Sequence, residues 1–297
     1  MYQRGAWSGV LVAGSTAFDT LARVERFPTE EEAMKADEIA SGAGGCGANV
    51  ARGLARLGHE PRLLSAVGAD FADSSAKQAL EGDGVDLGRL VRVEDEPTAA
   101  AMMATDDTLQ QTIIYDEGAT PRMRELEPIE AELGHFAPGE VTAYPELMAA
   151  VDRVVYDPGQ EVFYRPTEEV MAPLDEVDVL VVNEHEAEQL APAVGGLETL
   201  ADELEGLVVT HQGGQHVYQS GDRVELDAVE ADVVDPTGAG DAHCAGLVHG
   251  LAEGWQLPEA CRFGSVVAAC AIESVGAQRG LPTRDEAQAR LPGAKKT

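Results

Sequence analysis

Short apolar runs alternate with longer segments of mixed polarity along most of the chain. Five runs predict buried strands, at residues 10–13, 62–67, 151–156, 177–182 and 207–210. Between them, Val50, Leu54 and Leu57 recur on one helical face, and Gly58 follows where a left-handed helix stop belongs. The alternation predicts an α/β fold, with a mostly parallel sheet flanked by helices and ligands bound beyond the carboxyl ends of its strands.

Two β-prone segments interrupt this alternation. Residues 98–104 and 108–115 are separated by Asp106 and Asp107, a pattern typical of a hairpin. We expect the hairpin to project as a small β lid formed by segments at about 20–40 and 96–116; the alternative is an antiparallel edge of the main sheet. No linker or repeat divides the chain, so we interpret residues 1–297 as one domain.

The composition excludes several partners. The chain has 21 Lys and Arg against 53 Asp and Glu, a net charge of −32, so nucleic acid and anionic membranes would repel it. Since 44% of the residues are hydrophobic, it should nevertheless fold. Lysines occur at four positions: 35, 77, 295 and 296. Such acidity with few lysines suggests the cytoplasm of a halophile, where salt screens self-repulsion; the alternative is an ordinary acidic protein.

The cysteines and the apolar runs predict the compartment. Cys46, Cys244, Cys261 and Cys270 form no CxxC pair, and no export leader precedes the first predicted strand. Charged residues or glycines interrupt every hydrophobic run before 18 residues. We therefore expect a soluble cytoplasmic protein with reduced thiols.

The most informative segment is Val-Asp-Pro-Thr-Gly-Ala-Gly-Asp at residues 234–241, before a small and apolar segment at 242–252. Its glycines allow a tight turn into a helix, whose first N–H groups can bind phosphate oxygens. Asp241 then falls in the first turn, where it could accept the proton of an attacking hydroxyl. The alternative is an acidic residue favoured there by the helix dipole alone.

Two motifs carry a family resemblance. Asp-Pro-Thr-Gly-Ala-Gly-Asp at 235–241 resembles the C-terminal signature of the ribokinase (PfkB) family of sugar and nucleoside kinases. Gly-Gly-Cys-Gly-Ala-Asn-Val-Ala at 44–51, continuing to Gly58, resembles the N-terminal signature. The resemblance covers nearly the whole chain and implies a three-layer ribokinase-like fold with a β lid, and ATP- and Mg²⁺-dependent phosphorylation of a small molecule.

The resemblance also implies roles for single residues. Asp241 would be the base, and the backbone amides of Gly238, Ala239 and Gly240 would stabilise the transferring charge. The substrate would be held by Asp19, Gly44, Gly45 and Asn49. Without the resemblance, Asp19 would be a turn residue and Asn49 a helix cap.

Other positions are implied to hold the nucleotide and its cations. Asn183 and Glu186 match the Asn-x-x-Glu element, in which Glu186 would organise Mg²⁺ through water; taken alone they are an acidic helix start. Thr210 and Gly213 occupy the nucleotide-binding loop, although Gln212 stands where a glycine is expected. His243 replaces a commoner aromatic residue, and we expect it to have a packing role.

The resemblance further implies K⁺ near Asp235 and Thr237, and a homodimer formed through the lid.

The chain looks most similar to the archaeal nucleoside kinases within the family, from Tyr-Asp-Pro-Gly-Gln at 156–160 and Asp-Pro-Thr at 235–237. The predicted reaction is phosphorylation of a primary hydroxyl, the 5′-OH of a nucleoside.

The alternatives are a sugar kinase acting on ribose, ketodeoxygluconate or a fructose phosphate, and a non-catalytic nucleoside or sugar sensor. A third is a dinucleotide-binding oxidoreductase, because residues 42–47 satisfy GxGxxG. We disfavour it since residues 28–40 are charged and predict no preceding strand.

Overall fold

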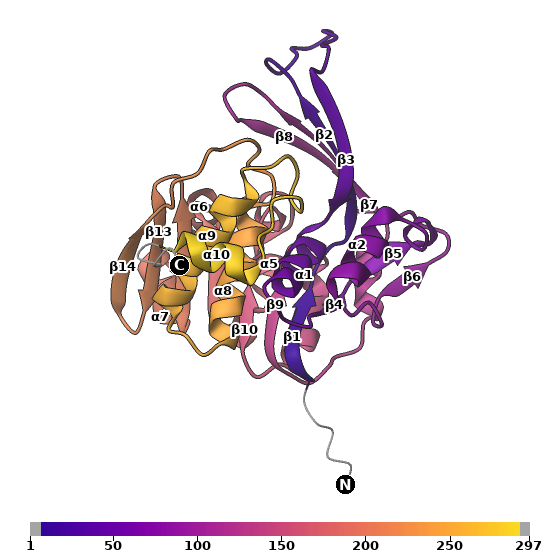
Figure 1. Ribbon diagram of the computed structural model, residues 1–297. Helices are drawn as coiled ribbons and strands as arrows, with labels where there is room; N and C mark the ends of the chain where they lie inside the picture. Colours follow the sequence, from indigo (N-terminus) through magenta and orange to yellow (C-terminus); the bar gives the residue numbers. More distant parts are fainter. Residues whose placement is uncertain (1–6, 292–297) are drawn as a thin grey trace.

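The computed structural model describes residues 7–291 and is built around an eight-stranded sheet (Figure 1). Its order is β14-β13-β12-β11-β10-β9-β1-β4; the six strands from β12 to β4 are parallel, and β13 and β14 are antiparallel. The strands are β1 (Trp7–Ala13), β4 (Arg62–Leu64), β9 (Ala131–Phe136), β10 (Val154–Tyr156), β11 (Val179–Asn183), β12 (Gly206–His211), β13 (Gly214–Gln219) and β14 (Asp222–Asp227). The predicted α/β class, with its mostly parallel sheet, is confirmed.

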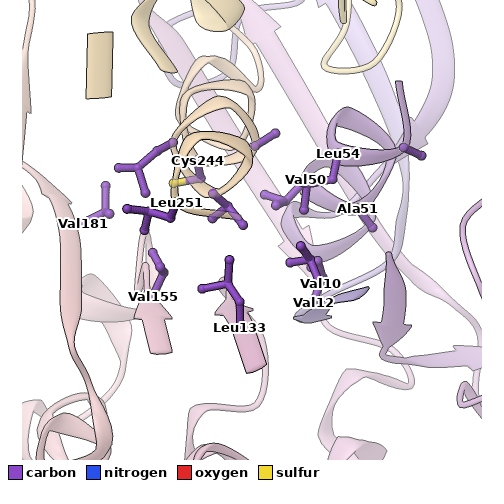
Figure 2. Packing of buried hydrophobic residues seen from close by; sticks show 14 of the residues in the cluster. Val10, Val12, Val50, Ala51, Leu54, Leu133, Val155, Val181, Cys244 and Leu251 are labelled. Carbon is purple, nitrogen blue, oxygen red and sulfur yellow. The ribbon is translucent and has the colours of Figure 1, made fainter. Parts of the chain in front are cut away.

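Helices cover both faces of this sheet, because strand side chains alternate between the faces. Val10 and Val12 point to a core shared with α1 (Cys46–Arg56), α2 (Ser75–Asp83), α8 (Ala239–Ala252) and α9 (Leu257–Ala271). Figure 2 shows part of this core, where Leu251 lies close to Val155 of β10. Leu11 and Ala13 point to the opposite core, shared with α3 (Tyr144–Met148), α5 (Thr167–Met171), α6 (Glu184–Leu190) and α7 (Leu197–Asp202).

A separate four-stranded sheet projects from the body (Figure 1). Its order is β3-β2-β7-β8, from β2 (Ala17–Arg23), β3 (Glu38–Gly44), β7 (Ala99–Thr105) and β8 (Gln111–Asp116). β7 and β8 form the predicted hairpin. The alternative, in which this hairpin is an edge of the main sheet, is wrong.

Two expectations about strands are corrected. The run at 62–67 is not one strand: β4 pairs with β1, whereas β5 (Ala66–Gly68) pairs with β6 (Val91–Val93), and between them the Ser65 hydroxyl accepts a hydrogen bond from Thr16 at 2.9 Å. A strand, β3, does precede the GxGxxG run, contrary to our reading of residues 28–40. It is an antiparallel strand at the edge of the small sheet, so the βαβ unit of a dinucleotide site is still missing.

The remaining elements are short. They are α4 (Glu161–Tyr164), α10 (Arg284–Arg290) and the 3₁₀ turns η1 (Ala69–Phe71), η2 (Thr120–Glu125), η3 (Val141–Ala143), η4 (Leu174–Glu176) and η5 (Ala191–Val194). Gly58 has φ of 96°, so α1 ends at the predicted stop; it begins at Cys46, before Asn49. Within residues 7–291, none of the helices has the length and apolarity needed to cross a membrane.

Candidate active site

A cavity of about 1060 Å³ lies between the carboxyl ends of the parallel strands and the small sheet. Most residues expected at the site line it, although they come from distant parts of the chain: Asp19, Gly45, Asn49, Asn183, Glu186, Thr210, Thr237, Gly238, Ala239, Gly240 and Asp241. Gly44, Gly213 and Asp235 are not among the lining residues. The packing of α1 against α8 brings the two signatures together at this edge of the sheet, where ligands of α/β proteins bind.

Asp241 lies in the first turn of α8, as predicted. The turn before it depends on Gly238, whose φ is 77° and whose added Cβ would come within 2.5 Å of the Cβ of Ala277. The Asn49 amide donates to Asp241 Oδ2 at 2.7 Å, and the Gln278 amide donates to Asn49 Oδ1 at 2.8 Å. Asn49 is therefore not a helix cap; its amide nitrogen is directed at the carboxylate.

Burial makes this part of the cavity electrostatically unusual. It raises the pKa of Asp241 well above the ordinary value, to about 6, although hydrogen bonds from Asn49 and Cys46 oppose the shift. Burial, and next the charge of Asp241, raise the pKa of Asp19 to about 7. A carboxylate with a pKa near neutrality is suited to accept a proton at physiological pH.

Asp19 and Gly44 form the other side of this region. They lie on adjacent strands, β2 and β3, and a Cβ at Gly44 would fall within 2.2 Å of three carboxyl atoms of Asp19. A glycine at this position therefore leaves the space that Asp19 occupies. Although Gly44 does not line the cavity, it positions a residue that does.

Asn183 and Glu186 form a capping box at the start of α6. Asn183 Oδ1 accepts hydrogen bonds from the N–H groups of His185 and Glu186 at 2.9 and 3.0 Å, and Glu186 Oε2 accepts one from the Asn183 N–H at 2.8 Å. Both residues also line the cavity, and burial raises the pKa of Glu186. Asn183 and Glu186 therefore cap α6, and the same two side chains are those predicted to organise the cation.

The predicted nucleotide loop is a tight hairpin between β12 and β13. Thr210 lines the cavity, but Gly213 does not. The N–H of Gly213 instead donates a hydrogen bond to His211 Nδ1 within the same loop, at 3.1 Å. His243 is buried and hydrogen-bonded to Gln215 Oε1 at 2.9 Å, and it also lines the cavity. It therefore packs inside the protein, as expected, next to the site.

The loop before α8 is held by Asp235. Its Oδ1 accepts from Thr237 N and Oγ1 at 3.0 and 2.6 Å, and its Oδ2 accepts from Gly276 N at 2.8 Å. Gln111 reaches this loop from the small sheet and donates to Thr237 Oγ1 at 2.7 Å. These hydrogen bonds fix the loop before α8, and the K⁺ site near Asp235 and Thr237 stays a prediction.

Sequence reasoning missed several residues of the site. Asp157, Gln111 and Cys46 line the cavity, and Gln278 lies just behind Asn49. Among the described lining residues, six are acidic and none is Lys or Arg; the acidic ones are Asp19, Asp116, Glu117, Asp157, Glu186 and Asp241. Nothing in a single sequence marks these positions as neighbours, because their proximity depends on strand register.

Comparisons with known proteins identify the family. Residues 8–284 match the model of the pfkB family of carbohydrate kinases, and the chain belongs to this family. It is 31% identical to the nucleoside kinase of Methanothermobacter thermautotrophicus, over 95% of each chain. Its fold is similar to that of the Methanocaldococcus jannaschii nucleoside kinase, with a TM-score of 0.88, 28% identity, and 97% and 99% of the two chains covered.

A Burkholderia thailandensis nucleoside kinase solved in complex with inosine is also similar, with a TM-score of 0.88, 26% identity, and 95% and 96% coverage. The fold is therefore ribokinase-like, as predicted, and within the family the chain is similar to archaeal nucleoside kinases. Kinases of this family transfer phosphoryl groups to hydroxyl groups, so the protein is a phosphotransferase.

Proposed function

We propose that the protein transfers the γ-phosphoryl group of ATP to the 5′-hydroxyl of a nucleoside, with Asp241 as the general base. The observation that carries this proposal is the position of Asp241: it lies at the start of α8, lines the cavity, and has a pKa of about 6. Family members solved with inosine, and with ADP and inosine together, support the choice of reactants.

The lining of the cavity supports a nucleoside over a phosphorylated sugar. A substrate phosphate is usually held by Arg or Lys, and no such residue occurs among the described residues that line the cavity. Instead, Met103, Ile113, Tyr115, Phe163 and Tyr164 offer the apolar and aromatic surface that suits a nucleobase. Free ribose would leave this surface without a partner.

Each residue has a chemical task in this reaction. Asp19 accepts hydrogen bonds from ribose hydroxyls, with Gly44 and Gly45 allowing close approach, and Asn49 orients the Asp241 carboxylate. Asp241 takes the proton of the attacking hydroxyl. The backbone N–H groups of Gly238, Ala239 and Gly240 stabilise negative charge on the phosphoryl oxygens.

Cations must complete a cavity this acidic. Glu186, Asn183 and Thr210 line the cavity. The first two would orient waters of a Mg²⁺ ion, and Thr210 would contact the nucleotide. Mg²⁺ supplies charge neutralisation between the phosphates. K⁺ activation near Asp235 and Thr237 remains a prediction; hydrogen bonds between these two residues fix the loop that carries them.

The small sheet forms the wall of the cavity that faces the carboxyl ends of the parallel strands. Its inner face contributes Asp19, Ala101, Met103 and Tyr115 to the cavity, so it can act as a lid that excludes water. Its outer face exposes Met102, Ile114 and Ile39, at 61%, 67% and 68%. This apolar surface supports a homodimer formed through the lid.

A turnover panel in molar KCl tests the proposed function. ATP consumption would be measured with purine nucleosides, pyrimidine nucleosides, ribose, ketodeoxygluconate and fructose phosphates. We expect a purine or pyrimidine nucleoside to give the highest kcat/KM and a 5′-phosphorylated product. Turnover of a sugar alone would contradict the nucleoside assignment, and nucleoside binding without turnover would indicate a sensor.

A further inference from the structure

A cluster of potential metal ligands lies at the wall of the cavity. His135 on β9, Asp157 after β10 and Cys244 on α8 each offer one ligand atom, and these three atoms lie within 4.8 Å of one another. Asp157 and Cys244 also line the cavity. Nitrogen, oxygen and sulfur atoms from these residue types form the typical ligand set of Zn²⁺.

The fold brings these residues together through strand alternation. Leu133 and Val155 point into the core shared with α8, where Figure 2 shows Cys244 on the helix near both strands. Two residues further along each strand, His135 and Asp157 fall on the same side. The cluster is therefore a product of the sheet register and of the position of α8.

His135 supplies an independent sign of a ligand. It is fully buried, yet neither ring nitrogen has a hydrogen-bond partner. Buried polar groups almost always have partners, and an exception in a protein often marks the position of a water or an ion. Burial lowers the pKa of His135 to about 3, so its imidazole is neutral, which is the form that binds metals.

One distance within the cluster suits a tetrahedral site. The Cys244 thiol donates a hydrogen bond to Asp157 Oδ2, and the two atoms are 3.5 Å apart. In a tetrahedral Zn²⁺ site, with Zn–S of about 2.3 Å and Zn–O of about 2.0 Å, two such ligand atoms are about 3.5 Å apart. Burial, and next the negative charges of Glu186 and Asp241, raise the pKa of Asp157 well above its ordinary value. A bound cation would offset this repulsion among the three acidic groups.

We propose that His135, Asp157 and Cys244 form a binding site for one divalent ion of the Zn²⁺ class, with its fourth position open to the cavity. Burial raises the pKa of both Asp157 and Cys244, so binding converts the Cys244 thiol to a thiolate and the Asp157 carboxyl to a carboxylate, and the displaced protons pass to solvent. The bound ion neutralises part of the negative charge that the cavity presents to nucleotide phosphates. This inference does not depend on the nucleoside assignment.

Co²⁺ binding to the whole protein tests the site directly. Chelator-treated protein would be titrated with Co²⁺ in molar KCl and a thiol-free reductant, without ATP or nucleoside. We expect one tight Co²⁺ ion per chain, with a thiolate-to-cobalt charge-transfer band in the near ultraviolet. Cys244→Ser should abolish this band.

Removing the imidazole ligand provides the second test. His135→Leu should weaken Co²⁺ binding by at least about tenfold, since even groups that only support a ligand contribute 10–100-fold. Cys270→Ser, at a cysteine that does not line the cavity, is the matched control and should retain the band; thermal unfolding would confirm that each variant folds. Absence of the band in the wild type, its survival in Cys244→Ser, or unchanged affinity in His135→Leu would overturn the proposal.

Kinase turnover measured on the same samples separates this proposal from the proposed function. A protein that turns over nucleosides but shows no thiolate band would refute the metal site alone. A protein that binds Co²⁺ through Cys244 but phosphorylates no nucleoside would refute the proposed function alone.

Discussion

Asp241 lies where two demands on a carboxylate conflict. Burial disfavours its charged form, whereas the Asn49 amide, 2.7 Å away, favours it. The resulting pKa of about 6 leaves the side chain unprotonated at neutral pH yet basic enough to accept a proton. We therefore expect kcat to fall as the pH decreases through about 6, because protonation removes the base.

Replacing this base tests its role. Asp241→Asn should lower kcat by about 10² or more, while the dissociation constant of the nucleoside, measured by calorimetry, stays within a few-fold. Glu253→Gln, at the other end of α8, is the control and should retain normal turnover. Turnover of Asp241→Asn close to that of the wild type would contradict the assignment.

The buried carboxyl group of Asp19 should lower the free energy of unfolding when it is ionised. Its pKa is about 7 in the folded protein, against about 3.9 in an unfolded chain. Between these values the folded state binds more protons, so the contribution of Asp19 to stability is present below about pH 4 and is lost as the pH rises through 7. Asp19→Asn should therefore raise the melting temperature at pH 8 by about 2 °C or more.

The measurement is thermal unfolding from pH 4 to 8 in molar KCl. Asp19→Asn should flatten the pH dependence, whereas Glu38→Gln, an exposed carboxylate on the same sheet, should not. We also expect Asp19→Asn to raise the KM of the nucleoside. Equal melting temperatures of the variant and the wild type at pH 8 would refute the burial argument.

At the scale of residues, the sequence predicts those positions that a local motif determines. The helix start at Gly238 and Asp241 can be predicted, because adjacent residues determine the turn. The hydrogen bond from Gln278 to Asn49, and that from Gln111 to Thr237, span 229 and 126 residues. They depend on tertiary packing, which no local pattern encodes.

At the scale of elements, the small sheet presents two different faces. Met102 and Ile114 are direct partners on β7 and β8 and are exposed. The next pair, Met103 and Ile113, lines the cavity, with Met103 buried and Ile113 still 57% exposed. This alternation follows from the two-residue period of a strand. The outer face has no reason to be apolar in a monomer, which leads to the next prediction.

Ile114→Asp should convert a homodimer into monomers. Burying an Ile side chain is worth about 1.5–3 kcal/mol, and a two-fold interface contains it twice, so dimerisation should weaken by about 10²-fold or more. Light scattering after size-exclusion chromatography in molar KCl would measure this. Val233→Asp, an exposed apolar site outside the sheet, is the control. A monomeric wild type at micromolar concentration would rule out the dimer.

Element boundaries were predicted less well than element types. Residues 62–67 contain enough apolar residues to suggest one strand, but they divide between two sheets, because β4 pairs with β1 and β5 pairs with β6. β3 was missed because Glu38, Ser41 and its glycines have low strand propensity. Its pairing with β2 holds it in place, which is a tertiary effect.

At the scale of the whole molecule, the net charge of −32 affects how the site binds a negatively charged nucleotide. The described cavity lining carries six carboxylates without Lys or Arg, so attraction for ATP must come from backbone N–H groups and bound cations. The repulsion from the rest of the protein reaches about 10 Å at 0.1 M salt but only about 3 Å at 1 M. Adaptation to a salt-rich cytoplasm stays a prediction from the composition, and the salt dependence of the protein tests it.

The KM of ATP should therefore rise as KCl is lowered from molar concentrations, because repulsion of the nucleotide is then less screened. The melting temperature should fall over the same range, since the surface carboxylates also repel one another. ATP kinetics and thermal unfolding measured in parallel separate the two effects, using only those salt concentrations at which the protein remains folded. The KM of a neutral nucleoside is the internal control and should change far less than that of ATP. If both constants change equally, the salt acts on the fold and not on the field that the cavity presents to phosphate.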